Sequence, residues 1–391
     1  MTSVADKVTR RWANLAGLWS RRRPAVGTTP ADVVHSENKW RLLRYRPGAA
    51  GVAFATPVLL VPSLINRHYV LDLQPGRSFA ESLVARGHEV YVLDWGTPGD
   101  EDRYLTLDEI ADGYLGRAVR VASRGAPRGK VHLLGYCLGG TLAVLHAAAR
   151  PARVASLTAL AAPVRFRDEG LLSAWTRSAG FDPGVVVDAL GNVPWPLMQS
   201  AFHMLRPTLN LSKAVHMLDR AWDDEFLDGF LALETWGNDN VSFPGAAFRR
   251  YIEELYRADA LMAGTFTLSG RPCRVESIAC PTLAVTFEHD NIVPWRGAAE
   301  LIDRVAATDR ERIHLAGGHV GAVVSRKASE TLWPRLSAWW AARDADSPSV
   351  PVPVPEVPLS VPEVRPSPPV SPPVEREPAR ASRKRVRRGR T

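Results

Sequence analysis

The sequence has few cysteines and no long apolar run. Only three cysteines, Cys137, Cys273 and Cys280, occur in 391 residues. Their odd number and wide spacing suggest neither a disulfide framework nor a zinc site, so we expect free thiols, no metal and no cofactor. No segment reaches the roughly 18 uncharged apolar residues of a membrane span, and the N-terminus lacks the apolar core of a secretory signal. We therefore expect a cytoplasmic protein.

The sequence also lacks a glycine-rich loop of the kind that binds nucleotide phosphates. Its positive charge is unevenly distributed. The net charge is +8, but much of the excess lies in the arginines of residues 10–23 and 376–390. The central part of the chain is close to neutral. Basic charge is therefore a property of the two ends, and it does not indicate a nucleic-acid-binding body.

Residues 1–45 are predicted to form an N-terminal amphipathic and basic segment. Its apolar residues fall near helical spacing among arginines, which favours an amphipathic helix packed on the protein. Association with a lipid-like surface is the alternative. The residues that set this spacing are Val4, Val8, Trp12, Leu15 and Trp19.

Residues 346–391 are predicted to form a disordered tail. Its first part, 347–378, is dense in proline and has no aromatic residue, which is typical of an extended linker. The basic cluster that follows, 376–390, is predicted either to contact an anionic surface such as DNA or phospholipid or to be a solvated tail without a partner. The composition does not separate these two interpretations.

Residues 46–345 alternate between short apolar runs and helical patterns. Continuous apolar runs of this kind predict a mainly parallel sheet with helices on both faces, which is an α/β architecture. From about 168 to 270, tryptophan-rich helical patterns replace the strands, and we expect a helical cap over the carboxyl edge of the sheet, where such folds bind ligands. The runs begin at Pro57, His88, Lys130, Val154, Cys280 and Arg312.

The segment GYCLGGTL places Cys137 between an apolar strand and a small-residue helix. A nucleophile elbow needs small residues two positions before and after the reactive one, and Gly135 and Gly139 meet that need. The helix that follows directs its N-terminal amides toward the sulfur, which favours the thiolate. A buried structural cysteine beside a glycine turn would be the default for this pattern alone.

Two further residues favour a catalytic interpretation of Cys137. Asp290 and His319 each follow a predicted strand, and the order nucleophile, acid, histidine is that of the α/β-hydrolase fold. We expect a Cys137, Asp290 and His319 triad. The oxyanion donors in this fold come from the residue after the nucleophile, here Leu138, and from the loop after an early strand. In that loop the candidate is a backbone N–H among Ser63 to Ile65, with Leu64 at its centre.

A cysteine nucleophile indicates the kind of reaction. Attack of a thiol on a thioester exchanges one thioester for another at nearly equal energy, so the acyl group stays activated for transfer. This suits an enzyme that takes acyl groups from a thiol carrier such as coenzyme A and passes them to a hydroxyl, with a hydrophobic cap limiting hydrolysis.

Long segments of the chain resemble the catalytic subunit of polyhydroxyalkanoate synthases, most closely the short, class III-like type that works with a second subunit. The resemblance covers most of 58–340 and includes INRHYVLDLQPGRS, YVLDWGTPGDEDRYLTLDEIADGY, GYCLGGTL, VDALGNVP, FPGAAFRRYIEELY, HDNIVPW and GGHVG. It implies polymerisation of (R)-3-hydroxyacyl groups from coenzyme A with release of the thiol. It also implies a growing polyester chain, a homodimer and a location at the surface of polyester granules.

By this resemblance, Cys137 carries the acyl group, His319 activates it and Asp290 assists attack by the hydroxyl. The segment ADALMAG lacks an asparagine expected in this family before the leucine, and the proline-rich linker and basic end are not part of the family pattern. Two alternatives remain open from the residues alone. One is a thiol-dependent polyester depolymerase, esterase or thioesterase on the same scaffold, and the other is a granule or nucleoid tether without catalysis.

Overall fold

The computed structural model describes residues 3–49, 51–205 and 209–344, and the predicted tail 346–391 lies outside them. Within the described residues the main sheet has eight strands in the order β1-β2-β4-β3-β5-β6-β9-β10. The six strands from β4 to β10 are parallel, whereas β2 pairs antiparallel with β4 and β1 antiparallel with β2. The strands are β1 (Ala31–Glu37), β2 (Trp40–Tyr45), β3 (Val58–Val61), β4 (Val90–Asp94), β5 (Val131–Tyr136), β6 (Val154–Leu160), β9 (Thr282–Phe287) and β10 (Arg310–Leu315).

The six apolar runs predicted as strands form β3, β4, β5, β6, β9 and β10, which confirms the α/β prediction. Successive residues of a strand point to opposite faces, and both faces are covered by helices. In β5, Leu133 packs into one hydrophobic core and Leu134 into the other. The whole strand is buried, which explains its mainly apolar sequence.

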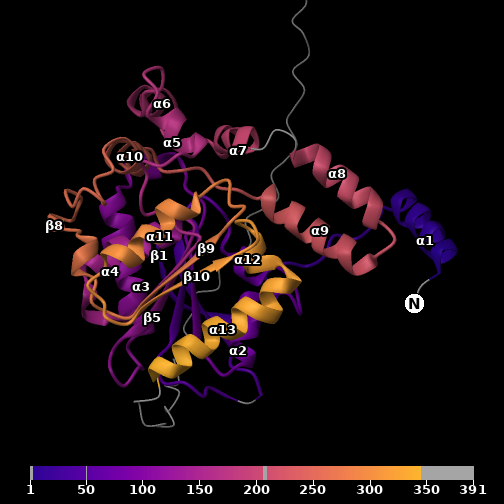
Figure 1. Cartoon of the computed structure of the whole chain (residues 1–391), viewed down its shortest axis with the longest axis horizontal. Coiled ribbons are helices and arrows are strands. Elements are labelled where there is room, and N and C mark those ends of the chain that lie inside the picture. The colour runs from indigo at the N-terminus through magenta and orange to yellow at the C-terminus, as the bar shows by residue number, and fades with distance from the viewer. Residues whose placement is uncertain (1–2, 50, 206–208, 345–391) are drawn as a thin grey trace, which may run out of the picture. The chain divides into compact units, whose positions relative to one another are not determined.

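Helices cover both faces of the sheet (Figure 1). Helices α3 (Leu115–Ala122), α4 (Leu138–Ala149) and α11 (Trp295–Arg304) supply apolar residues to one core. Helices α2 (Phe79–Ala85), α12 (Gly321–Val324) and α13 (Arg326–Asp344) supply the other. Short 3₁₀ or π turns are η1 (His68–Asp72), η2 (Asp100–Tyr104), η3 (Glu109–Tyr114), η4 (Pro151–Arg153), η5 (Tyr251–Arg257) and η6 (Val275–Ser277).

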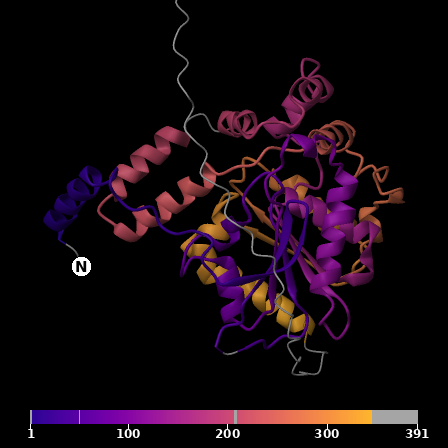
Figure 2. The same ribbon diagram turned by 180° about the vertical axis from the view of Figure 1, so that it is seen from behind.

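The segment between β6 and β9 adds no strand to the main sheet among the described residues. It is mainly helical, with α5, α6, α7 and α10 together at one edge of the body (Figures 1 and 2). We call these helices, with α8 and α9, the cap. The elements are α5 (Leu171–Thr176), α6 (Pro183–Leu190), α7 (Trp195–Leu205), α8 (Leu209–Arg220), α9 (Asp224–Gly237), α10 (Gly245–Arg250) and the hairpin β7 (Thr267–Leu268) and β8 (Arg271–Pro272).

The expected boundary at residue 45 is wrong, because β1 and β2 belong to the sheet. β1 is an edge strand, and both strands carry charged or polar residues among the apolar ones, as edge strands do. Short runs with mixed polarity resemble loops in sequence. The folded body therefore includes residues 31–45.

The expected N-terminal helix is present as α1 (Val4–Ala16), but its expected packing is wrong. Ser3 and Asp6 form a capping box that fixes its start. The helix is held by polar groups: the Arg11 guanidinium donates to the Asp219 carbonyl at 2.6 Å. None of its residues is buried, and of the predicted stripe only Leu15 is half-buried, whereas the other four apolar side chains, Trp12 among them, are exposed.

Candidate active site

The turn at Cys137 has the geometry of a nucleophile elbow. Cys137 joins β5 to α4 with φ +55° and ψ −131°. Residues other than glycine rarely adopt this backbone conformation, because it costs free energy. The glycines of the motif allow close backbone contacts. A Cβ on Gly135 would lie 2.4 Å from the Cα of Gly140, and one on Gly139 would lie 2.2 Å from the Val61 carbonyl oxygen. Packing therefore requires glycine at both positions, and the strained Cys137 lies between them.

His319 and Asp290 form a buried pair. The Nδ1 atom of His319 lies 2.7 Å from Oδ2 of Asp290, and their side chains are only 8% and 1% exposed. The other carboxylate oxygen accepts hydrogen bonds from the backbone N–H groups of Ile292 and Val293. Both oxygens of Asp290 are thus held in place, and Nε2 of His319 is the ring nitrogen left for Cys137.

Cys137 and His319 are coupled electrostatically. Burial alone would lower the pKa of His319, but the negative charges of Cys137 and Asp290, together with side-chain hydrogen bonds to both, raise it to about 10. His319 is therefore a base of raised proton affinity, and its side chain lies within hydrogen-bond reach of the Cys137 sulfur. The site is therefore built to hold a nucleophilic sulfur next to a proton acceptor.

The two expected oxyanion donors belong to the residue that follows Cys137 and to the loop after β3. Leu138 is the first residue of α4, where backbone N–H groups have no partner within the helix. Leu64 is buried in the loop after β3, and its neighbour Ile65 lines the space around Cys137. Gly139 packs against the backbone of Val61, which fixes the distance between this loop and α4. The assignment of Leu138 and Leu64 stays a prediction.

Two cavities open at Cys137. One, of about 410 Å³, contains His319 and has many polar groups in its walls. The other, of about 560 Å³, is almost entirely apolar. The polar walls include Asn66, Gln199, His203, Asn240 and the Lys213 and Glu234 ion pair, and the apolar walls include Trp175, Phe181, Val193, Phe248, Tyr251 and Ile252. We call these the polar and the apolar cavity, because hydrogen-bonding side chains gather in the first, although apolar residues such as Met198 and Trp236 also line it.

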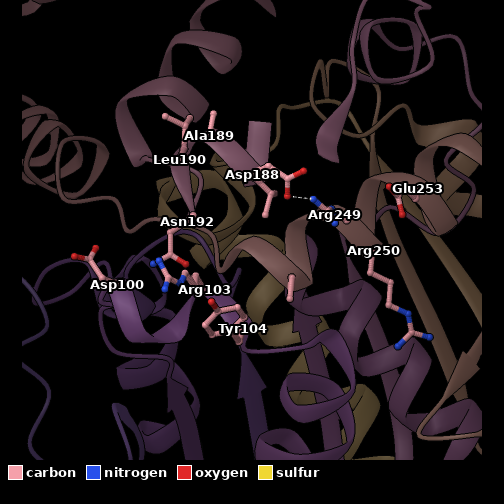
Figure 3. Close-up of a pocket in the computed structure, with 13 residues that line it drawn as sticks. Asp100, Arg103, Tyr104, Asp188, Ala189, Leu190, Asn192, Arg249, Arg250 and Glu253 are labelled. Carbon is pink, nitrogen blue, oxygen red and sulfur yellow. Dashed lines mark hydrogen bonds and ion pairs between the residues drawn. The ribbon is translucent and has the colours of Figure 1, made fainter. Parts of the chain in front are cut away.

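A third cavity of about 740 Å³ lies between η2, α6 and α10 (Figure 3). Neither Cys137 nor His319 lines it. Its most prominent contact is the ion pair of Arg249 with Asp188 at 2.5 Å, drawn as a dashed line in Figure 3. We assign this cavity no part in the chemistry at Cys137. Among the described residues, no group of His, Cys, Asp and Glu side chains is arranged to hold a metal ion.

The chain is similar in sequence to known proteins over most of its length. Residues 24–83 match the family described as "Poly-beta-hydroxybutyrate polymerase (PhaC) N-terminus", and residues 56–323 match the alpha/beta hydrolase fold. The chain is 35% identical over 317 residues to the "Poly(3-hydroxyalkanoate) polymerase subunit PhaC" of Allochromatium vinosum, which covers 80% of this chain and 89% of that protein. The chain belongs to the PhaC family. It is also 34% identical over 356 residues to the protein of the same name from Haloferax mediterranei, covering 88% of this chain and 72% of that one.

A solved structure supports the fold of this PhaC family member. The putative non-heme bromoperoxidase BpoC of Mycobacterium tuberculosis superimposes with a TM-score of 0.50, covering 80% of this chain and 99% of that one at 15% identity. This likeness concerns the fold alone. Together with the match to the alpha/beta hydrolase fold, it confirms the fold predicted from the sequence.

The structure brings together the three residues that the sequence predicted for this PhaC family member. Cys137, His319 and Asp290 meet although they come from distant parts of the chain. The sequence did not reveal the cap residues around the sulfur, such as Met198 and Phe202 of α7. Their only signal was the general apolar character of the segment PWPLMQSAFHML.

Proposed function

We propose that this chain synthesises poly(3-hydroxyalkanoate) through an acyl-enzyme on Cys137. The observation that carries the proposal is the strained Cys137, coupled to His319 at the point where a polar and an apolar cavity meet. The names of the curated relatives in the PhaC family support the polymerase activity. The substrate is a 3-hydroxyacyl thioester of coenzyme A, and no resident cofactor takes part.

Acylation begins with transfer of the Cys137 thiol proton to His319. The thiolate attacks the thioester carbonyl, the bond between carbonyl carbon and carrier sulfur breaks, and the carrier leaves with the proton from His319. The backbone N–H groups of Leu138 and Leu64 are suited to stabilise the oxyanion of the tetrahedral intermediate. One thioester is exchanged for another, so little free energy is lost.

Elongation transfers the acyl group to the hydroxyl of the next 3-hydroxyacyl thioester. His319 accepts the hydroxyl proton, the oxygen attacks the acyl carbonyl, and Cys137 leaves as a thiolate that recovers the proton. The lengthened chain is then an ester whose terminal thioester still carries coenzyme A. Attack by Cys137 on that thioester returns the chain to the enzyme and releases the carrier thiol, so each cycle adds one unit.

Asp290 acts in this scheme as a positioning residue for His319. One of its oxygens contacts His319 and the other accepts two backbone N–H groups. It is not among the residues that line either cavity at Cys137. A carboxylate in this arrangement fixes the ring tautomer and stabilises the imidazolium. Direct contact with the attacking hydroxyl, the role that the family resemblance suggested, is less well supported by these contacts.

A location at the surface of polyester granules is part of the proposal. None of the described helices is long and apolar enough to cross a bilayer. Instead, α1 and the neighbouring α8 each expose a row of apolar side chains at helical spacing, which suits adsorption to an apolar phase. These residues are Val4, Val8 and Trp12 on α1 and Leu211, Val215 and Leu218 on α8, all between 47% and 80% exposed.

The partners stay proposals from the family. They are a second copy of the chain in a homodimer and a separate synthase subunit. The basic cluster at 376–390, which is proposed to bind an anionic surface, lies outside the described residues. If truncation after Asp346 leaves salt-dependent binding to DNA and to anionic vesicles unchanged, the role of this cluster is refuted.

Release of coenzyme A from 3-hydroxybutyryl-coenzyme A tests the proposed function, with the insoluble polymer weighed in parallel. We expect equal amounts of thiol and polymerised units, with both lost in Cys137→Ala. Free 3-hydroxybutyrate in place of polymer would indicate a thioesterase. No release, even with a second subunit added, would contradict the synthase function.

A further inference from the structure

The two cavities at Cys137 adjoin one another. Five residues line both of them, so these residues surround the place where the cavities meet. Two of the five, Met198 and Phe202, come from the cap helix α7. The complete set is Ile65, Cys137, Met198, Phe202 and Ile292.

The sequence of α7 explains the junction. Each residue of an α-helix advances by about 100°, so residues four apart share a face. Met198 and Phe202 are four apart and lie at the centre of the face toward Cys137. On one side of them follow the residues of the polar cavity, Trp195, Gln199 and His203, and on the other side those of the apolar cavity, Leu197, Ala201 and Met204.

We propose that Met198 and Phe202 are a partition that keeps the acyl carrier and the polyester chain on opposite sides of the Cys137 sulfur. The polar cavity receives the arm of coenzyme A, and the apolar cavity receives the growing chain. This inference rests on the proposed function and extends it by assigning a compartment to each reactant.

The chemistry of the walls supports the assignment of the polar cavity. The arm of coenzyme A between nucleotide and thiol carries amide groups, which need hydrogen-bonding partners when they leave water. This cavity presents carboxamides fixed by one another and by the backbone: the Asn66 amide donates to Asn240 Oδ1 at 2.5 Å, and the Gln199 amide donates to the Gly237 carbonyl at 3.1 Å.

The apolar cavity suits the polyester. An aliphatic polyester has no hydrogen-bond donor along its chain, so burial among hydrocarbon groups leaves no buried donor unpaired. Aromatic rings on its walls pack against one another, as Phe243 does with Phe248 and Tyr251. An apolar wall of this kind offers water no hydrogen-bonding partner near the acyl thioester.

A matched pair of substitutions on α7 tests the partition. Ala201→Trp fills the apolar cavity, and Gln199→Trp fills the polar one. Val185→Trp, at an exposed position of α6 that lines neither cavity, controls for the added ring. Rapid quench with 3-hydroxybutyryl-coenzyme A measures the burst of thiol released during acylation, and the steady state measures elongation. Thermal unfolding checks that each variant is folded.

We expect Ala201→Trp to slow elongation at least tenfold while its acylation burst falls less than threefold. We expect Gln199→Trp to raise KM for 3-hydroxybutyryl-coenzyme A at least tenfold, and to restore acylation when 3-hydroxybutyryl-N-acetylcysteamine replaces the long carrier. Equal loss of both steps in both variants, or the reverse pattern, overturns the partition. Absence of any acyl group on Cys137 in the unsubstituted chain would instead refute the proposed function on which it rests.

Discussion

The contact between Asp290 and His319 predicts how far Asp290→Asn slows acylation. The pKa of His319 rises from 6.5 to about 10, which corresponds to on the order of 5 kcal/mol in favour of the imidazolium. Asp290 contributes to this rise through its charge and its hydrogen bond, as Cys137 does. Asp290→Asn removes this charge and its hydrogen bond to the imidazolium, and a hydrogen bond to a charged group is worth about 1.5–3 kcal/mol, or roughly 10- to 150-fold in rate. A wrong ring tautomer adds to this loss, since the corresponding change in serine proteases costs about 10⁴-fold.

Stopped-flow measurement of thiol release gives the acylation rate of Asp290→Asn. Glu288→Gln is the matched control, because Glu288 also contacts a histidine, His314, at 2.8 Å, but in an exposed position. We expect a loss of at least 30-fold in the first variant and less than threefold in the second. An acylation rate for Asp290→Asn within threefold of the unsubstituted chain would refute the reasoning.

Three further predictions concern stability and surface binding. Burial lowers the pKa of His88 to about 4 and of His132 to about 3. Because the unfolded chain takes up these protons at a higher pH than the folded chain does, the free energy of unfolding should fall as the pH drops from about 6.5 to 4, by on the order of 3 kcal/mol for His88 alone. A urea midpoint that stays constant over this pH range would contradict this prediction. Gly139→Ala forces a Cβ against the Val61 carbonyl, so unfolding by urea should show a loss of about 2 kcal/mol or more, and an unchanged midpoint would contradict the close contact. Trp12→Asp should weaken sedimentation with polyester particles at least fivefold at unchanged unfolding temperature, and equal sedimentation would refute adsorption through α1.

The central fold was predictable because its strands are buried on both faces. Every residue of β5 and β9 is buried, and their sequences are mainly apolar and uncharged, as expected for strands of a parallel sheet with both faces covered. The order of Cys137, Asp290 and His319 along the chain was informative because the carboxyl ends of parallel strands meet at one edge. Local sequence therefore identified the nucleophile, and topology identified its partners.

Other features depend on tertiary contacts that sequence periodicity does not report. The edge strand β1 and its neighbour β2 have mixed polarity, so nothing in 31–45 distinguishes them from a loop. The helix α1 was predicted, but its attachment through Arg11 and the exposure of Trp12 depend on where α8 lies. The two cavities arise from the way α7 crosses above Cys137. The sequence of α7 reads as one apolar segment and does not reveal that its two sides line different cavities.

Trapping of the acyl group on the enzyme tests the central claim most directly. The chain is mixed with 3-hydroxybutyryl-coenzyme A, quenched with acid during the burst and digested, and the cysteine peptides are weighed by mass spectrometry. Cys273 and Cys280 serve as internal controls, because burial raises the pKa of their thiols to about 12 and about 11. We predict a hydroxyacyl thioester on Cys137 and none on the other two cysteines. Polymer formation with Cys137 unmodified at every time point would contradict the account.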